Sequence, residues 1–101
     1  MLTIARGTRA GDAILILCGE IDFASARTLE AELHRAENAL PRRIVLNLAA
    51  LDFIDSTGIH LLIDAQQRAD AMGHELVLTH VPPQAERLFS LTGIDARITI
   101  E

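Results

Sequence analysis

The chain alternates between two hydrophobic patterns, and this alternation limits the folds that it can adopt. The segment Ala13–Cys18 is apolar throughout, and Ile44–Leu48 is apolar except for Asn47. Short runs of this kind predict strands that are buried on both faces of a sheet. Between the two runs, apolar residues instead recur three or four positions apart, which is typical of one side of a helix. These residues are Ala26, Leu29, Leu33, Ala36 and Leu40.

Three helices are predicted, and residues with known end preferences mark their boundaries. They span 24–40, about 57–72, and the segment from Pro82-Pro83 to Gly93. Asp22 or Ser25 can cap the first helix, and Pro41 stops it. Gly73 and Gly93 stand where a helix commonly ends in a left-handed residue. A proline at the first helical position favours the third helix.

Weaker strand patterns complete the fold class. Residues 3–9 are expected to form an edge strand, 76–78 a short buried strand, and 97–101 a half-exposed strand with alternating polarity. Strands that alternate with helices imply βαβ crossovers and a largely parallel sheet. A length of 101 residues suits one domain. We expect an α/β fold with one domain over 1–101, in which helices pack against a mixed, largely parallel sheet.

Charge and hydropathy argue against nucleic-acid and membrane partners. The chain has 9 basic and 14 acidic side chains, for a formal net charge of −5. It has no basic stripe interleaved with aromatic residues, so binding to nucleic acid is not expected. The longest apolar run, 13–18, is far shorter than the roughly 20 residues that cross a bilayer, and no signal peptide opens the chain. We expect a cytoplasmic protein without membrane insertion.

The sequence gives no support for metal or cofactor chemistry. Cys18 is the single cysteine, which excludes an internal disulfide and multi-cysteine zinc sites. Its place in an apolar run predicts a buried core thiol. No two histidines stand three or four residues apart on a predicted helix, so His34, His74 and His80 are expected at the surface or in an interface. The glycine patterns of nucleotide-binding loops are missing, and we expect neither a metal ion nor a cofactor.

The segment 52–58, with the sequence Asp-Phe-Ile-Asp-Ser-Thr-Gly, carries the clearest candidate site. It joins the second buried strand to the second helix, and in α/β sheets functional groups gather beyond the carboxyl ends of strands. A structural interpretation is that Asp55 or Ser56 caps the helix, for about 1 kcal/mol. A functional interpretation is that Ser56, or less readily Thr57, accepts a phosphoryl group. Both interpretations stay open at this point.

A phosphoryl group on Ser56 would add about −1.5 to −2 charges at the helix start. Unpaired backbone N–H groups and the helix dipole would tolerate this charge, whereas Asp55 and Asp52 would repel it. Phosphorylation would then change the surface charge strongly and the fold little.

A nucleophilic hydrolase is the enzymatic alternative. Ser56 follows Asp55 rather than standing in a Gly-x-Ser-x-Gly pattern, so no nucleophile elbow is present. No spacing ties a histidine to Ser56. We therefore expect no catalytic residues and no enzymatic activity.

Four motifs, in order along the chain, resemble the signatures of the STAS domain family. They are Gly19-Glu20-Ile21-Asp22, Val45-Leu46-Asn47-Leu48, Phe53-Ile54-Asp55-Ser56-Thr57-Gly58-Ile59 and Leu88-Phe89-Ser90-Leu91-Thr92-Gly93-Ile94. Together they extend over nearly the whole chain, and Asp-Ser-Thr-Gly with its flanks is quite specific. Within the family, the chain is most similar to bacterial anti-sigma factor antagonists (anti-anti-sigma factors).

This resemblance implies a regulatory switch between partners. Such an antagonist binds an anti-sigma factor that is also a GHKL-type serine kinase, and thereby frees a sigma factor. The kinase uses ATP to phosphorylate the serine that corresponds to Ser56, which weakens binding, and a metal-dependent serine phosphatase reverses the step. The resemblance also assigns Asp22, Asp55, Thr57 and Gly58 to the acceptor loop and its partner-binding surface. It implies that the Asp22 position approaches this loop, so that Asp22, Asp52 and Asp55 gather around one hydroxyl.

Two features depart from the family pattern. His60 lies one turn beyond Ser56, where relatives often have a small residue. It either contacts the phosphate as an imidazolium or covers the helix start, and we favour the second role. The sequence given stops at Glu101, without the final amphipathic helix that is usual in antagonists. Either this helix is absent, or the sequence is a trimmed piece of a longer chain. Absence of the helix would expose apolar sheet surface and favour a homodimer or partner docking.

The alternative function within the family is a non-switching accessory or scaffold subunit, as in lipid-transport ATPase complexes or stress-sensing assemblies. The missing final helix favours this alternative. The intact acceptor serine, Ser56, argues against it.

Overall fold

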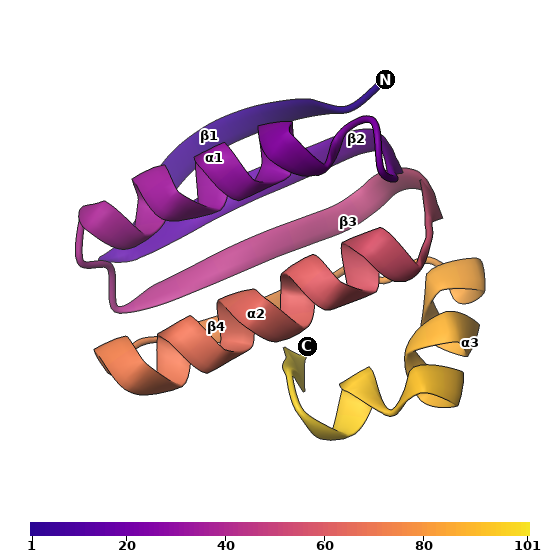
Figure 1. Cartoon of the computed structure of the whole chain (residues 1–101). Helices are drawn as coiled ribbons and strands as arrows, with labels where there is room; N and C mark the ends of the chain where they lie inside the picture. Colours follow the sequence, from indigo (N-terminus) through magenta and orange to yellow (C-terminus); the bar gives the residue numbers. More distant parts are fainter.

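Five strands form one sheet in the computed structural model, which describes residues 1–101. The elements are β1 (Thr3–Arg9), β2 (Asp12–Ile21), α1 (Ala26–Asn38), β3 (Arg43–Ile54), α2 (Ser56–Met72), β4 (Glu75–Thr79), α3 (Pro83–Thr92), a 3-10 turn (Ile94–Ala96) and β5 (Thr99–Ile100). The strands lie side by side in chain order. β1 is antiparallel to β2, and all the other neighbours are parallel (Figure 1). The predicted α/β fold with a mixed, largely parallel sheet is confirmed.

The helix boundaries mostly follow the signals in the sequence. α2 ends at Gly73 with φ +84°, and α3 ends at Gly93 with φ +77°, both in the left-handed region. α1 is shorter than predicted: Leu40 lies outside it with φ +52° and is 80 % exposed. Leu40 therefore does not belong to the apolar stripe, because the residue before Pro41 is disfavoured in helical geometry. None of the three helices combines the length and the apolar character that crossing a membrane requires.

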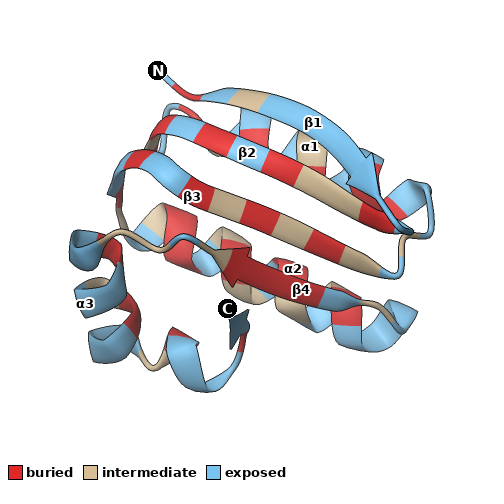
Figure 2. Cartoon of the chain, turned by 180° about the vertical axis from the view of Figure 1, so that it is seen from behind, coloured by how far each residue is buried: buried red, intermediate tan, exposed pale blue.

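The helices α1 and α2 cover only one face of the sheet. They lie in front of it in Figure 1, and no helix crosses the opposite face in Figure 2. Leu15, Leu46 and Leu78 stand side by side on the covered face and are at most 1 % exposed, whereas Ile16 is 43 % exposed. The prediction of strands buried on both faces is therefore wrong for β2 and β3. Successive side chains alternate between a covered face and an open face.

Cys18 lies on the open face and is exposed, so the prediction of a buried core thiol is also wrong. Its neighbour Leu17 is fully buried on the covered face. The next side chain of the strand must then point away from the helices.

The last strand is shorter than the predicted 97–101. β5 contains only Thr99 and Ile100. The N–H groups of Arg97 and Ile98 instead donate to the carbonyl oxygen of Ile94, at 2.9 and 3.0 Å. A tight turn therefore takes up the residues that precede the short strand.

A buried ion pair joins the two helices that cover the sheet. Glu37 of α1 is 3 % exposed, and both of its carboxylate oxygens accept from Nε of Arg68 on α2, at 2.9 and 3.0 Å. These hydrogen bonds pair the buried carboxylate with a guanidinium, which avoids the free-energy cost of burying an unpaired charge. The pair fixes α1 and α2 relative to each other.

The start of the chain is held at the end of β2. Gly19 has φ +113°, and a side chain there would overlap the carbonyl oxygen of Met1. The amine of Met1 donates to Glu20 Oε1 at 2.7 Å. The N-terminus therefore lies at the same end of the sheet as the loops that follow β2 and β3 (Figure 1).

Candidate functional site

The loop between β3 and α2 lies beside the loop between β2 and α1. Ile21, the last residue of β2, is paired with Ile54, the last residue of β3. The backbone N–H of Asp55 donates to the carbonyl oxygen of Ile21 at 3.1 Å. Asp22, which follows Ile21, is thus brought near the acceptor loop, where the family resemblance places it. Both loops leave the carboxyl ends of parallel strands, where α/β proteins commonly place functional groups.

Asp55 is the N-cap of α2. Its Oδ1 accepts from the backbone N–H groups of Thr57 at 2.9 Å and Gly58 at 3.2 Å. The structural interpretation of the motif is confirmed for Asp55, and Ser56 is instead the first residue of the helix. The cap also uses two of the N–H groups that a bound anion would otherwise contact at this helix start.

The hydroxyl of Ser56 is accessible and uncommitted. Ser56 is exposed, whereas Thr57 is only partly exposed, and no side-chain hydrogen bond of the chain engages the Ser56 hydroxyl. His60 is exposed one turn further along α2, on the side of the helix that Ser56 occupies. The structure therefore presents Ser56 to solvent on a capped, rigid helix start.

Gly58 allows α2 to approach the sheet closely. A β-carbon at this position would lie 2.6 Å from Cγ1 of Ile54 and 2.7 Å from Cγ2 of Ile21. Real β-carbons do not come so near to other atoms, so any side chain here would push the helix start away from the strand ends. Gly58 thus sets the position of the acceptor loop without facing solvent.

Asp22 and Ser25 form a closed turn before α1. Asp22 Oδ1 accepts from the N–H of Ser25 at 3.0 Å and from its hydroxyl at 3.1 Å. The N–H of Asp22 in turn donates to Ser25 Oγ at 2.9 Å. Ser25 occupies the N-cap position of α1, but its side chain makes no capping bond. The expectation that Ser25 caps α1 is therefore wrong. The Asp22 carboxylate instead accepts from the backbone N–H of the N-cap residue and closes the turn that leads into the helix.

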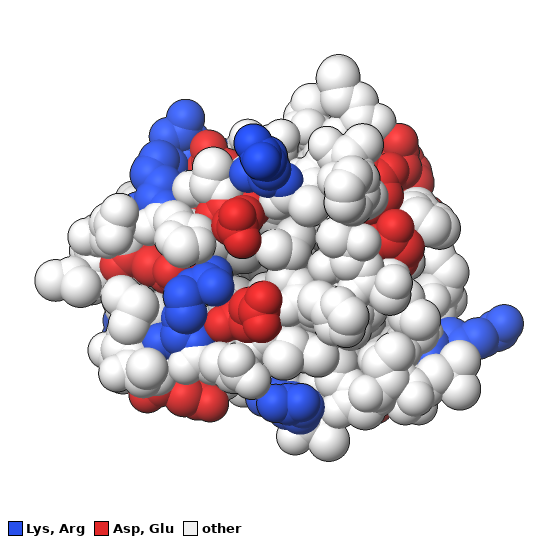
Figure 3. Space-filling model, viewed as in Figure 1, with Lys and Arg blue, Asp and Glu red and all other residues white.

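The acidic residues at this end have separate partners. The Asp55 carboxylate caps α2, and Asp22 bonds to Ser25. The hydrogen bond to Glu20 raises the pKa of the Met1 amine above its ordinary value, and the charges of Asp22 and Asp52 add to this shift. The three aspartates thus share one end of the molecule, yet none forms a hydrogen bond with Ser56. In Figure 3, acidic atoms line the upper right edge, which is the end that carries these loops in Figure 1.

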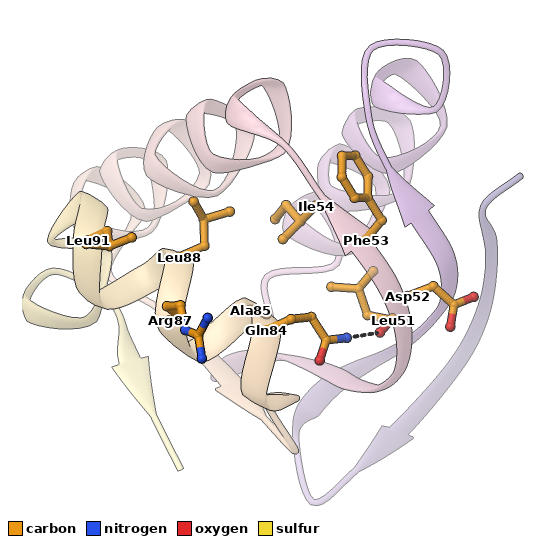
Figure 4. A pocket seen from close by; sticks show the side chains of 9 residues that line it. All are labelled: Leu51, Asp52, Phe53, Ile54, Gln84, Ala85, Arg87, Leu88 and Leu91. Carbon is orange, nitrogen blue, oxygen red and sulfur yellow. Dashed lines mark hydrogen bonds between the residues drawn. The ribbon is translucent and has the colours of Figure 1, made fainter.

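An apolar groove lies next to the acceptor loop, and the sequence did not reveal it. It has a volume of about 320 Å³ and separates the end of β3 from α3 (Figure 4). Its lining residues are Leu51, Asp52, Phe53, Ile54, Gln84, Ala85, Arg87, Leu88 and Leu91. The only signal in the sequence was an apolar Leu88–Leu91 segment of a short helix, and nothing in that pattern placed α3 opposite β3.

The structure shows no arrangement of side chains typical of metal binding or nucleophilic catalysis. No group of three or more His, Cys, Asp or Glu side chains could hold a metal ion. His34 and His80 are exposed, as predicted, and His60 is exposed too. His74, which was also predicted at the surface, is only partly exposed. No histidine is hydrogen-bonded to Ser56.

Comparison with known proteins identifies the family. The model of the STAS domain matches residues 4–101. BtrV of Bordetella bronchiseptica, which is assigned as an anti-sigma factor antagonist, is 34 % identical over 84 residues, or 81 % of this chain and 72 % of BtrV.

Solved structures share the fold. The crystal structure of an anti-sigma factor antagonist from Mycobacterium paratuberculosis has a TM-score of 0.90 at 23 % identity, covering 99 % of this chain and 85 % of that chain. The phosphorylated form of the Bacillus cell fate determinant SpoIIAA has a TM-score of 0.73 at 20 % identity, covering 100 % of this chain and 91 % of that chain.

Proposed function

Because this chain belongs to the STAS domain family, we propose that it is an anti-sigma factor antagonist switched by phosphorylation of Ser56. In its unmodified form it binds an anti-sigma factor and thereby releases a sigma factor. The observation that carries this proposal is the exposed, unbonded hydroxyl of Ser56 at the start of α2, on a loop that Asp55 caps. The names of relatives such as BtrV support it.

The modifying partner in this proposal is a GHKL-type serine kinase, the anti-sigma factor itself. The γ-phosphoryl group of ATP passes to Oγ of Ser56, the hydroxyl proton goes to a base of the kinase, and ADP leaves. A serine phosphatase then hydrolyses the phosphoester with water and restores the hydroxyl. The antagonist supplies only the acceptor and its surroundings, so it acts as a regulatory binding protein and not as an enzyme. The existence of a phosphorylated form of the structural neighbour SpoIIAA fits this assignment.

The capped helix start explains why a phosphate at Ser56 would disturb a partner. The N–H groups of Thr57 and Gly58 already donate to Asp55, so they are not free to neutralise the phosphate. The new charge of about −1.5 to −2 would stay exposed beside the carboxylates of Asp55 and Asp22. An interface formed over this loop would have to bury an unpaired charge, which commonly costs 2–5 kcal/mol.

The roles of the surrounding residues follow from their positions. Asp55 holds the loop, Gly58 sets its distance from the sheet, and Asp22 shapes the neighbouring loop. Thr57 is half-covered beside Ser56 and is assigned to the partner-binding surface. His60, exposed one turn along α2, belongs to the same surface. Since sigma factors act on intracellular transcription, the proposal places the protein in the cytoplasm.

The test mixes the purified chain with ATP and, in turn, each GHKL-type serine kinase encoded in the same genome. Phosphate is mapped by mass spectrometry in the wild type, in Ser56→Ala and in the matched control Thr57→Val. The proposal expects label on Ser56 that Ser56→Ala abolishes and Thr57→Val keeps. An unlabelled wild type with every kinase would contradict it and favour the non-switching accessory subunit.

A further inference from the structure

The apolar groove between β3 and α3 is an interaction surface in its own right. Its floor contains Leu51, Ile54 and Ala85, which are between 1 and 7 % exposed. Its volume of about 320 Å³ is at the lower limit of typical small-molecule sites, roughly 300–1,000 Å³. An open depression of this size suits one or two side chains from a protein partner better than a cofactor.

Exposed apolar side chains extend this surface beyond the groove. Leu91 of α3 is 80 % exposed, and Phe53 at the end of β3 is 50 % exposed. Single exposed apolar residues are common, but several that adjoin one apolar depression are typical of an interaction site. In Figure 4, Leu88 and Ile54 face each other across the groove.

The α3 wall of the groove carries a positive charge that has no salt-bridge partner within the chain. Arg87 lies on the α3 wall, whereas Asp52, at the end of β3, directs its carboxylate away from α3 (Figure 4). Both are exposed, and neither takes part in any of the seven salt bridges of the chain. A partner seated in the groove would complement this charge by presenting a carboxylate to Arg87.

The groove adjoins the acceptor loop without including it. Ile54 is separated from Ser56 by one residue, Asp55, whose carboxylate faces the helix start rather than the groove. A partner seated in the groove can therefore reach Ser56 at the same time. Groove residues contact the partner but not the hydroxyl that reacts.

We propose that the groove between β3 and α3 anchors the anti-sigma kinase through one bulky aliphatic side chain of that partner, flanked by an acidic residue that pairs with Arg87. This inference rests on the proposed function and adds to it the chemistry of the docking segment. Buried aliphatic or aromatic anchors surrounded by polar pairs carry most of the binding energy in many interfaces. The groove contact raises affinity, and Ser56 receives the phosphoryl group.

Two exposed positions test the groove without disturbing the core. Leu91→Asp and Arg87→Glu are compared with Leu40→Asp and Arg9→Glu. Leu40 is also 80 % exposed, and Arg9 is an exposed arginine without a salt bridge. Both control residues lie at the opposite end of the sheet, near the Asp12–Arg43 pairing. Circular dichroism and urea unfolding are used to check that all four variants are folded before binding is compared.

The probe is the purified kinase that labels Ser56 in the experiment above, with binding measured by calorimetry and phosphorylation measured at steady state. Leu91→Asp and Arg87→Glu are expected to raise both Kd and KM by about tenfold or more. The kcat of phosphorylation should stay within about twofold of wild type, because the reacting hydroxyl is untouched. The controls are expected to match wild type. Reversing the partner's acidic residue to arginine is expected to restore binding to Arg87→Glu.

The two proposals fail in different ways. If Leu91→Asp and Arg87→Glu bind and are phosphorylated like wild type, the groove is not the docking site, although the switch at Ser56 stands. If kcat falls while Kd and KM do not change, the groove acts on the chemical step and the anchoring role is overturned. If no kinase binds or labels the wild type, the proposed function falls, and the groove's assigned occupant falls with it.

Discussion

Gly58 lies so close to Ile54 that a β-carbon on the glycine would stand 2.6 Å from Ile54 Cγ1. This contact sets α2 tightly against the end of β3 and fixes where Ser56 emerges. Gly58→Ala should therefore lower the free energy of unfolding by about 1–3 kcal/mol, the usual cost of overpacking, despite the better helix propensity of alanine. Urea unfolding measures this change.

Gly7→Ala is the matched control for that variant. A β-carbon at Gly7 would have no neighbour within 4 Å, and glycine weakens a strand through its conformational freedom. Gly7→Ala should be neutral or slightly stabilising. Equal losses in the two variants would show that close approach at Gly58 does not govern stability.

The cap at Asp55 should have a measurable energetic role. Asp55→Ala removes the acceptor for the N–H groups of Thr57 and Gly58 and is expected to cost about 1 kcal/mol. Asp55→Asn keeps an acceptor oxygen without the charge, so it should retain most of the stability. Identical stabilities for the wild type and Asp55→Ala, read from urea midpoints, would contradict the capping role.

The buried pair between Glu37 and Arg68 should contribute more than the surface pairs. Arg68→Met leaves the Glu37 carboxylate 3 % exposed and without its partner, which should cost about 3 kcal/mol. Arg35→Met breaks the exposed pair with Glu32 and should cost about 0.5 kcal/mol or less. Thermal or urea denaturation compares the two, and similar losses would mean that burial of Glu37 is not what makes its pair strong.

The contact between Arg43 and Asp12 predicts a pH dependence. Hydrogen bonds from Arg43 at 2.9 and 3.1 Å lower the pKa of Asp12 below its ordinary value of 3.8. A lowered folded-state pKa contributes stability that is present above 3.8 and is lost as the pH falls through the folded-state value. Asp12→Asn should thus be less stable than wild type at pH 7, and the difference should shrink toward pH 2.

The exposed Asp95, which has no salt bridge, provides the control for this pH effect. Asp95→Asn should match the wild type in stability at pH 7, because this exposed carboxylate has no salt bridge to lose. A stability difference for Asp12→Asn that stayed constant between pH 7 and pH 2 would rule out the ion pair as its cause.

Local patterns in the sequence were sufficient to predict most elements and the position of the candidate site. Gly73, Pro83 and Gly93 marked real helix ends because their backbone preferences are local. The helix ends depended on short-range chemistry alone. The adjacency of Asp22 to the acceptor loop was expected only from the family resemblance, and the pairing of Ile21 with Ile54 gives its physical reason.

Features that depend on which surfaces meet were not predictable from the sequence. Cys18 and Ile16 lie in an apolar run, yet they face away from the helices, because only one face of the sheet is covered. A run of aliphatic residues does not show whether other elements cover one face of its strand or both. The groove likewise arises from the placement of Leu88 opposite Ile54, which no local pattern encodes.

The carboxylates of the site show the same limit. The sequence placed Asp22, Asp52 and Asp55 near one hydroxyl, and the structure gives the first and last of them hydrogen bonds to Ser25 and to the start of α2. Side-chain rotamers and backbone donors decide such pairings. Residues that the fold brings close together therefore need not form hydrogen bonds with one another.

Calorimetric titration of the anti-sigma kinase, in the presence of ADP, with the unmodified chain and with the chain phosphorylated on Ser56 tests the central claim most directly. The account predicts that the phosphorylated form binds at least about 30-fold more weakly, which corresponds to an unpaired interface charge costing 2 kcal/mol or more. Its urea midpoint should stay close to that of the unmodified chain. Equal affinity of the two forms would contradict the switch.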